Sequence, residues 1–286
     1  MQDFDAQAQA FSEQIEAELE DGRLNFPTSL DVSLRVKRLA DDPDSSLDSI
    51  ASVVKAEPVL SAKAVRMANA VLLNPYGSLI ADVNTAVKRI GLASLRCLAF
   101  AVAAEQLSQD HRSKHMRLIA SGLWMHSVDV ASWSYALARH LRTVNPDTAM
   151  LAGMMVDIGQ FFLLARASAY PALEENLERF AEFVSVWNEP VGRAILEVFE
   201  LPEDVLDAFE YENPYGGSWP PENLADLIFV ASLAAETPNP FDSALGIQRR
   251  PELFDSCIAG IEKDKLDALL DAARAGKMEM LAAVCG

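Results

Sequence analysis

The sequence contains few of the residues from which metal and redox sites are usually built. Among 286 residues there are 3 cysteines and 4 histidines. The cysteines, Cys97, Cys257 and Cys285, lie far apart, and none belongs to a CxxC pair. An odd number of scattered cysteines argues against a disulfide framework and a thiolate metal site. We therefore expect a reduced, cytoplasmic protein.

Several common catalytic and ligand-binding motifs are also missing. The sequence has no GxGxxG after a strand, no GxxxxGK[ST], no HExxH and no GxSxG. These absences argue against standard dinucleotide and P-loop sites, zincin proteases and α/β-hydrolases. Residues 1–21 carry seven acids and no Lys or Arg, and every long apolar run is interrupted by polar residues. We expect no secretory signal, no membrane insertion and no cofactor.

The charge is strongly negative and unevenly distributed. The net charge of −18 disfavours general binding to nucleic acids, because the phosphate backbone is also negative. Residues 23–117 are mildly basic, with 13 Lys and Arg against 9 Asp and Glu. An ordinary solvated helix surface explains this balance. It is also the sole support for a small nucleotide ligand.

Apolar residues recur at helical spacing nearly throughout, which predicts an all-α fold of many medium-length helices. One long helix, or two collinear ones, is expected over 113–142, and separate helices over 171–184 and 188–199. At the N-terminus, one apolar stripe must dock on the body of the protein or on a partner, and docking on the body is favoured. This stripe consists of Phe4, Ala8, Phe11, Ile15 and Leu19.

Two polar residues stand out in apolar surroundings. Asp157 lies in a segment predicted to be one helix from Met150 to Ala165, and a buried carboxylate needs a partner or a metal. His126 lies on the apolar stripe of its own helix, where a hydrogen-bonded core histidine is the commoner explanation. The turn at Asn145-Pro146 lets the two helices pack antiparallel and bring both side chains together.

Three motifs occur in order along the chain, at Arg66 to Ala70, Leu123 to Ser127 and Ala149 to Gly159. Together they resemble the HDOD domain of bacterial signalling proteins. Leu123-Trp124-Met125-His126-Ser127 is similar to the family's "L-W-x-H-S", and Ala149 to Gly159 is similar to its "A-F-L-A-G-L-L-H-D-I-G". Arg66-Met67-Ala68-Asn69-Ala70 resembles "R-x-A-N-S". The resemblance implies an N-terminal helical part packed on a helical part like that of the HD phosphohydrolases. We assign 1–22 to an acidic amphipathic helix, 23–112 to the N-terminal part and 113–286 to the HD-like part.

The departures from this pattern concern the metal site. In the HD superfamily a histidine, a His-Asp doublet and a later aspartate hold a divalent cation. Here His126 and Asp157 match, as vestigial positions. The other ligand positions are lost, at Val156, Asn188, Glu212 and Ser232. The resemblance then implies no catalytic residue and no metal. We expect a direct contact between His126 and Asp157 in place of the cation.

The resemblance implies a non-catalytic regulatory module of bacterial signal transduction that binds an unidentified protein partner. The alternative is an HD-type phosphohydrolase or phosphodiesterase with rearranged ligands. Candidate partner surfaces are the stripe of the N-terminal helix and five basic residues, each equally typical of a solvated surface. These residues are Lys63, Arg66, Lys88, Arg89 and Arg96.

Overall fold

The structure is a computed structural model. It describes residues 4–22, 24, 35–36, 38–40, 42, 44–71, 73–75, 77, 79–109, 113–198, 203–209, 219–247 and 263–285. Every regular element in these ranges is an α-helix, so the predicted all-α class is confirmed. The helices are α1 (Phe4–Glu20), α3 (Leu47–Lys55), α4 (Pro58–Ala68), α5 (Val83–Gln109), α6 (Lys114–Leu141), α7 (Pro146–Met155), α8 (Ile158–Ala167), α9 (Pro171–Glu175), α10 (Leu177–Val198), α11 (Glu203–Asp207), α12 (Leu224–Ala234), α13 (Pro240–Ala244) and α15 (Lys263–Cys285).

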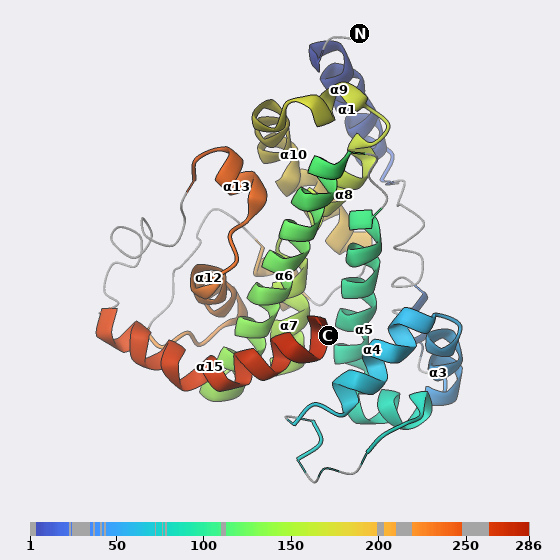
Figure 1. Cartoon of the computed structure of the whole chain (residues 1–286), viewed down its shortest axis with the longest axis vertical. Helices are drawn as coiled ribbons and strands as arrows, with labels where there is room; N and C mark the ends of the chain where they lie inside the picture. Colours follow the sequence, from blue (N-terminus) through green and yellow to red (C-terminus); the bar gives the residue numbers. More distant parts are fainter. Residues whose placement is uncertain are drawn as a thin grey trace.

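Helix α6 forms the centre of the molecule, with α5, α7, α12 and α15 packed around it (Figure 1). Every residue from Ser127 to Ala138 is buried, so this part of the helix is covered on all sides. Buried hydroxyls need hydrogen-bond partners, and Ser127, Ser132 and Ser134 each donate to the carbonyl four residues earlier. Of the two alternatives expected over 113–142, one long helix or two collinear ones, the structure has the single helix, on which the other helices pack.

The helix predicted from Met150 to Ala165 is broken at its centre. Helix α7 ends at Met155 and α8 begins at Ile158, because Asp157 leaves the helical region with φ −107° and ψ 25°. The segment Pro146–Ala167 has the length and hydropathy of a membrane span, but 83% of its most apolar window is buried inside the fold. Because of this break, Asp157 lies at the junction between two core helices, α7 and α8.

The predicted end of a helix between residues 184 and 188 is wrong. Helix α10 runs without interruption from Leu177 to Val198 and includes Pro190. A proline inside a helix removes the hydrogen bond to the carbonyl four residues earlier. That carbonyl belongs to Val186, a residue that is 67% exposed, so water can satisfy it.

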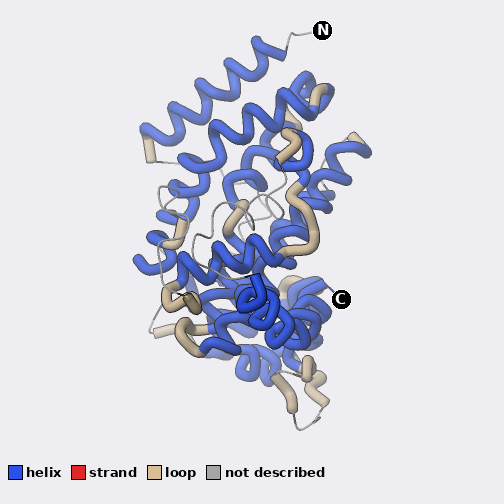
Figure 2. Tube along the Cα trace, turned by 90° about the vertical axis from the view of Figure 1, so that its left-hand side faces the viewer, coloured by secondary structure: helices blue, strands red, loops and turns tan. Residues whose placement is uncertain are grey.

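The N-terminal helix docks on the body of the protein, as expected. Its stripe residues Phe11 and Ile15 are fully buried, and Phe11 stacks on Tyr170 with ring centroids 4.8 Å apart. Arg166 of α8 binds both carboxylate oxygens of Glu18, at 2.6 and 2.8 Å. Helix α1 thus lies against α9 and α10 at one end of the molecule (Figure 2). The apolar stripe is therefore occupied and does not serve as a free partner surface.

Candidate functional site

His126 is held between two elements that pack on α6. Its Nδ1 donates to the backbone carbonyl of Thr237, at 2.6 Å, in the segment after α12. A carbonyl only accepts, so Nδ1 carries a proton and Nε2 faces the other way. A histidine whose Nδ1 is held by a carbonyl is oriented as metal-ligating histidines commonly are. The side chain is 12% exposed.

Nε2 of His126 lies 3.4 Å from Oδ2 of Asp157, whose side chain is 7% exposed. The predicted contact between the two side chains is therefore confirmed, at ion-pair distance. The contact is attractive when the imidazole carries both protons, because Nε2 then donates toward a carboxylate. Asp157 reaches this position because the chain breaks between α7 and α8, at the point where both helices lie beside α6.

The other positions assigned to lost ligands are distributed over three regions. Val156 is partly buried beside Asp157 and packs against the hydrophobic core. Asn188 of α10 lies directly against Gly159 of α8. Ser232 is partly buried on α12, and Glu212 lies outside the described residues. The structure thus brings His126 and Asp157 together, and it packs Asn188 against Gly159, which lies two residues after Asp157. The assignment of these positions as former ligands stays a prediction.

The close approach of α10 to Gly159 gives a test of this packing. A methyl group on Gly159 would overlap the Asn188 backbone carbonyl and lie 2.6 Å from its Oδ1. We expect Gly159→Ala to lower the free energy of unfolding by about 1–3 kcal/mol, because backbone atoms cannot rotate away. Urea denaturation followed by circular dichroism measures this change.

Gly276→Ala is the matched control for that substitution. A methyl group there would meet the Ala136 side chain at 3.7 Å, an ordinary contact distance. Alanine also favours a helix interior over glycine by about 0.5–1 kcal/mol, so this variant should be no less stable than the parent. Equal stability of the two variants would show that α8 and α10 are packed less closely than the structure has them.

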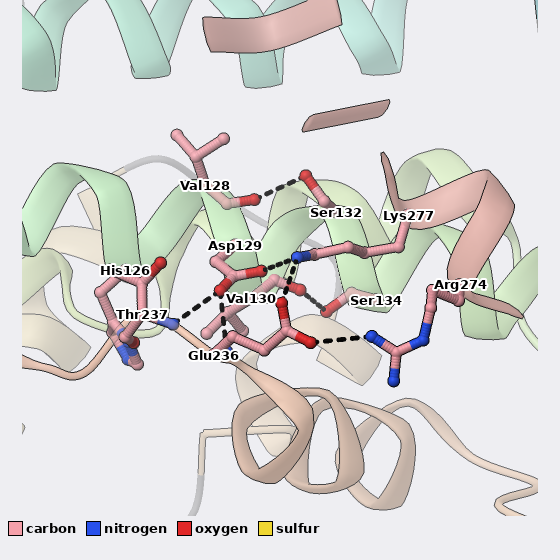
Figure 3. A network of polar contacts seen from close by, with 10 residues as sticks. All are labelled: His126, Val128, Asp129, Val130, Ser132, Ser134, Glu236, Thr237, Arg274 and Lys277. Atoms are coloured by element: carbon pink, nitrogen blue, oxygen red, sulfur yellow. Dashed lines mark hydrogen bonds and ion pairs between the residues drawn. The ribbon is translucent and has the colours of Figure 1, made fainter. Parts of the chain in front are cut away.

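A second polar group next to His126 was missed by the sequence analysis. Asp129, one turn further along α6, is 1% exposed. Its Oδ2 accepts from the backbone N–H groups of Glu236 and Thr237, both at 2.8 Å, and its Oδ1 lies 2.8 Å from Nζ of Lys277. Figure 3 shows Asp129 between Lys277 and the Glu236–Thr237 backbone. His126 and Asp129 thus hold the same short segment from one face of α6.

The network continues to the surface through Glu236. Arg274 donates to Glu236 Oε1 at 2.9 Å, and Lys277 Nζ lies 3.4 Å from Oε2 (Figure 3). The hydrogen bond from Arg274, aided by the nearby charge of Lys277, lowers the pKa of Glu236 from its usual range. Both cations also lie over the ring of Trp133, at 5.8 and 5.6 Å from its centroid. The network therefore fastens α15 to α6 and to the end of α12.

The sequence contained enough information to identify Asp129 as a second candidate residue. His126 and Asp129 are three residues apart in an apolar helix, which puts them on one face. The signal for Lys277 was weak, because its partner lies 148 residues earlier in the chain. A lysine in an amphipathic helix is normally solvated, whereas this side chain is 3% exposed.

Comparison with known proteins decides the family. The model of the HDOD domain family matches residues 26–215, about two thirds of the chain. The chain belongs to the HDOD family. The helical fold and the position of His126 and Asp157 in it agree with the resemblance of the motifs. The split of the chain at residues 22 and 112 stays a prediction.

Solved structures have the same fold. A candidate metal-dependent phosphohydrolase from Shewanella amazonensis is 26% identical, with a TM-score of 0.67 over 96% of this chain and 99% of that chain. An HDOD domain protein of unknown function from Geobacter sulfurreducens is 22% identical, with a TM-score of 0.59 over 95% and 96%. An uncharacterized protein of Treponema pallidum is 23% identical over 226 residues. The matched region covers 71% of this chain but 40% of the length of that protein.

Lys63, one of the basic residues assigned to a partner surface of this HDOD protein, is engaged inside the fold. Its Nζ donates to the carbonyl of Val284 at 3.0 Å and lies 3.2 Å from Oε2 of Glu105. The same ammonium is 5.5 Å from the ring centroid of Trp124, and its side chain is 12% exposed. Lys63 therefore links α4 to α5, α6 and the end of α15, and it does not present a free charge.

The remaining four basic positions lie on α4 and α5. Arg66, Lys88 and Arg89 are exposed, and Arg96 is partly buried. Arg89 also donates to the carbonyl of Leu73, at 3.3 Å. The exposed part of the assigned surface is thus reduced to the three residues Arg66, Lys88 and Arg89, and its role in binding stays a prediction.

Proposed function

We propose that this HDOD protein is a non-catalytic module of bacterial signal transduction that acts by binding a protein partner. The observation that supports this proposal is the mutual engagement of His126 and Asp157. The histidine Nδ1 holds the Thr237 carbonyl, and its Nε2 lies 3.4 Å from the carboxylate. The pair joins α6, the α7–α8 junction and the segment after α12, which is a structural task that needs no cation.

The donor set fits a catalytic metal poorly. A catalytic divalent site typically takes three or more protein ligands and leaves one position open for water. His126 and Asp157 supply two donors, and the Val156 side chain supplies none. Among the residues that the structure describes, no group of three or more His, Cys, Asp and Glu side chains is placed to hold a cation. We therefore derive no reaction step through a metal.

The alternative is hydrolysis of phosphate esters with rearranged ligands. Its support is the name of the Shewanella amazonensis structure, a candidate metal-dependent phosphohydrolase. The two functions differ in what they require of Asp157. A hydrolase needs it as a metal ligand, whereas a binding module needs it as the partner of His126.

Metal binding and turnover measured on the same sample test the proposal. We expect equilibrium dialysis of the full chain against Mn²⁺ to detect no saturable ion bound at this site, and bis-p-nitrophenyl phosphate to remain intact. Asp157→Asn should behave like the parent in both assays. Asp264→Asn, an exposed carboxylate on α15, is the control for lost charge. One ion per chain, with turnover that Asp157→Asn abolishes and Asp264→Asn retains, would contradict the proposal.

The proposed partner surface comprises Arg66, Lys88 and Arg89 at the exposed side of α4 and α5. Basic side chains there would favour an acidic partner and would raise the association rate more than the affinity. We also propose a cytoplasmic location. The free thiols of Cys97, which is buried, and Cys285, which is partly buried, are compatible with a reducing compartment.

A further inference from the structure

A pocket lies between α5 and α6, and its described lining residues do not include His126 or Asp157. Its volume is about 550 Å³, and seven side chains line it. This volume falls within the range of about 300–1,000 Å³ that is typical of sites for small ligands. The lining residues are Glu105, Lys114, Arg117, Leu118, Ser121, Trp124 and Met125.

The described charged side chains of this pocket carry a net positive charge, whereas the protein as a whole is strongly negative. The chain carries a net charge of −18, yet among the described residues that line the pocket there are two cations, Lys114 and Arg117, and one carboxylate, Glu105. The negative charge is already opposed by Lys63, whose Nζ lies 3.2 Å from Oε2 of Glu105. Lys114 and Arg117 lie three residues apart on the first turns of α6, so they face one side of the pocket. This side is therefore suited to an anion.

The other side of the pocket is apolar and preformed. Trp124 donates its indole N–H to the carbonyl of Ala101 at 3.0 Å, and the ammonium of Lys63 lies over its ring. These two contacts hold the ring in place before any ligand arrives. Leu118 is 63% exposed and Met125 is partly buried beside it, so both have apolar surface left to cover. A ligand with a flat apolar body would cover that surface and gain free energy from its burial.

We propose that this pocket binds a nucleoside monophosphate or an aromatic anion of the same size. The phosphate lies against Lys114 and Arg117, and the ring lies against Leu118, Trp124 and Met125. A carboxylate is a good acceptor for ring N–H groups, so Glu105 recognises the polar edge of the ring, and Ser121 contributes a hydroxyl. Ligand binding in this pocket does not depend on whether His126 and Asp157 bind a metal. It would give this protein a site for a small effector.

Isothermal titration with GMP, AMP, guanosine and inorganic phosphate tests this assignment on the full chain. We expect at least one of the two nucleotides to bind, and guanosine and phosphate each to bind about tenfold more weakly or worse, because each lacks half of the contacts. Affinity should fall as the salt concentration rises, since the two cations are exposed.

Three variants distinguish binding in the pocket from non-specific attraction to positive charge. Lys114→Ala combined with Arg117→Ala should weaken nucleotide binding about tenfold or more. Lys55→Ala combined with Lys263→Ala removes the same charge from exposed positions elsewhere and should leave binding unchanged. Ser121→Trp fills the pocket without altering its charge and should abolish binding.

Three results would overturn the proposal. The first is an absence of binding by both nucleotides at millimolar concentration. The second is phosphate alone binding as tightly as either nucleotide, which would indicate an adventitious anion site. The third is equal weakening by the pocket pair and the control pair of substitutions. Circular dichroism confirms that each variant is folded before it is titrated.

Discussion

Replacement of Lys277 by methionine should lower the free energy of unfolding by about 3–5 kcal/mol. The ammonium group of Lys277 lies 2.8 Å from Oδ1 of Asp129, and the two side chains are 3% and 2% exposed. Methionine keeps most of the apolar length of the side chain, but it removes the ammonium and leaves the Asp129 carboxylate buried without its cation. A buried charge that loses its partner is among the most destabilising changes in a protein core. Thermal and urea denaturation measure the effect.

A double substitution identifies its cause. Asp129→Asn together with Lys277→Met leaves no charge at the site. The asparagine carbonyl can still accept from the N–H groups of Glu236 and Thr237, which now bind Oδ2 at 2.8 Å. We expect this pair to recover at least half of the stability lost in Lys277→Met. Lys263→Met, an exposed position on the same helix, should change stability by less than about 0.5 kcal/mol. A similarly small change for Lys277→Met would contradict the buried ion pair.

His126→Ala should destabilise the fold by about 3 kcal/mol, because it removes the imidazole from beside the buried Asp157 carboxylate and removes the hydrogen bond to the Thr237 carbonyl. His115→Ala is the control, since His115 is an exposed histidine on the same helix. Adding Asp157→Asn to His126→Ala should restore part of the loss by removing the stranded charge. If His126→Ala were as stable as His115→Ala, the pair would have no structural role, and its retention would instead favour a metal site.

These two predictions concern neighbouring parts of one junction. His126 and Asp129 both bind the Glu236–Thr237 segment, and Lys277 brings α15 to the same place (Figure 3). The junction holds three regions of the chain together: α6, the segment after α12, and α15. The proposed binding function would require a fixed surface, and this network connects the helices in the centre of the fold.

The sequence predicted the secondary structure where helical periodicity was long and uninterrupted. Helix α6 and the docking of α1 follow from apolar residues at spacings of three and four, because such a stripe must be covered. The helix break at Asp157 was not predicted, since the three residues before it, Met154, Met155 and Val156, are apolar and include no proline or glycine. The helix expected to begin at residue 188 does not begin there. Helix α10 continues through Pro190, because an exposed turn tolerates the lost hydrogen bond.

The candidate site was partly predictable, because the cost of burying a charge can also be judged from residue types in order. A carboxylate in an apolar segment must be paired, and the motif around Asp157 indicated His126 as the partner, which the 3.4 Å contact confirms. The basic surface was less predictable. Lys63 and Arg66 occupy one helix face in the sequence, but the end of α15 covers Lys63 and leaves Arg66 exposed. Periodicity gives the face of a helix and does not give the element that packs on it.

The sequence by itself determined the helical class, the family resemblance and the need of Asp157 for a partner. These properties depend on local spacing and on the cost of burying a charge, and both can be evaluated from residue types in order. Tertiary structure alone decided that Lys277 neutralises Asp129, that Lys63 is internal, and that Lys114, Arg117 and Trp124 surround one pocket. Each of these facts depends on which helices meet in space. The free energy that selects such a packing is summed over the whole core, so no short stretch of sequence contains it.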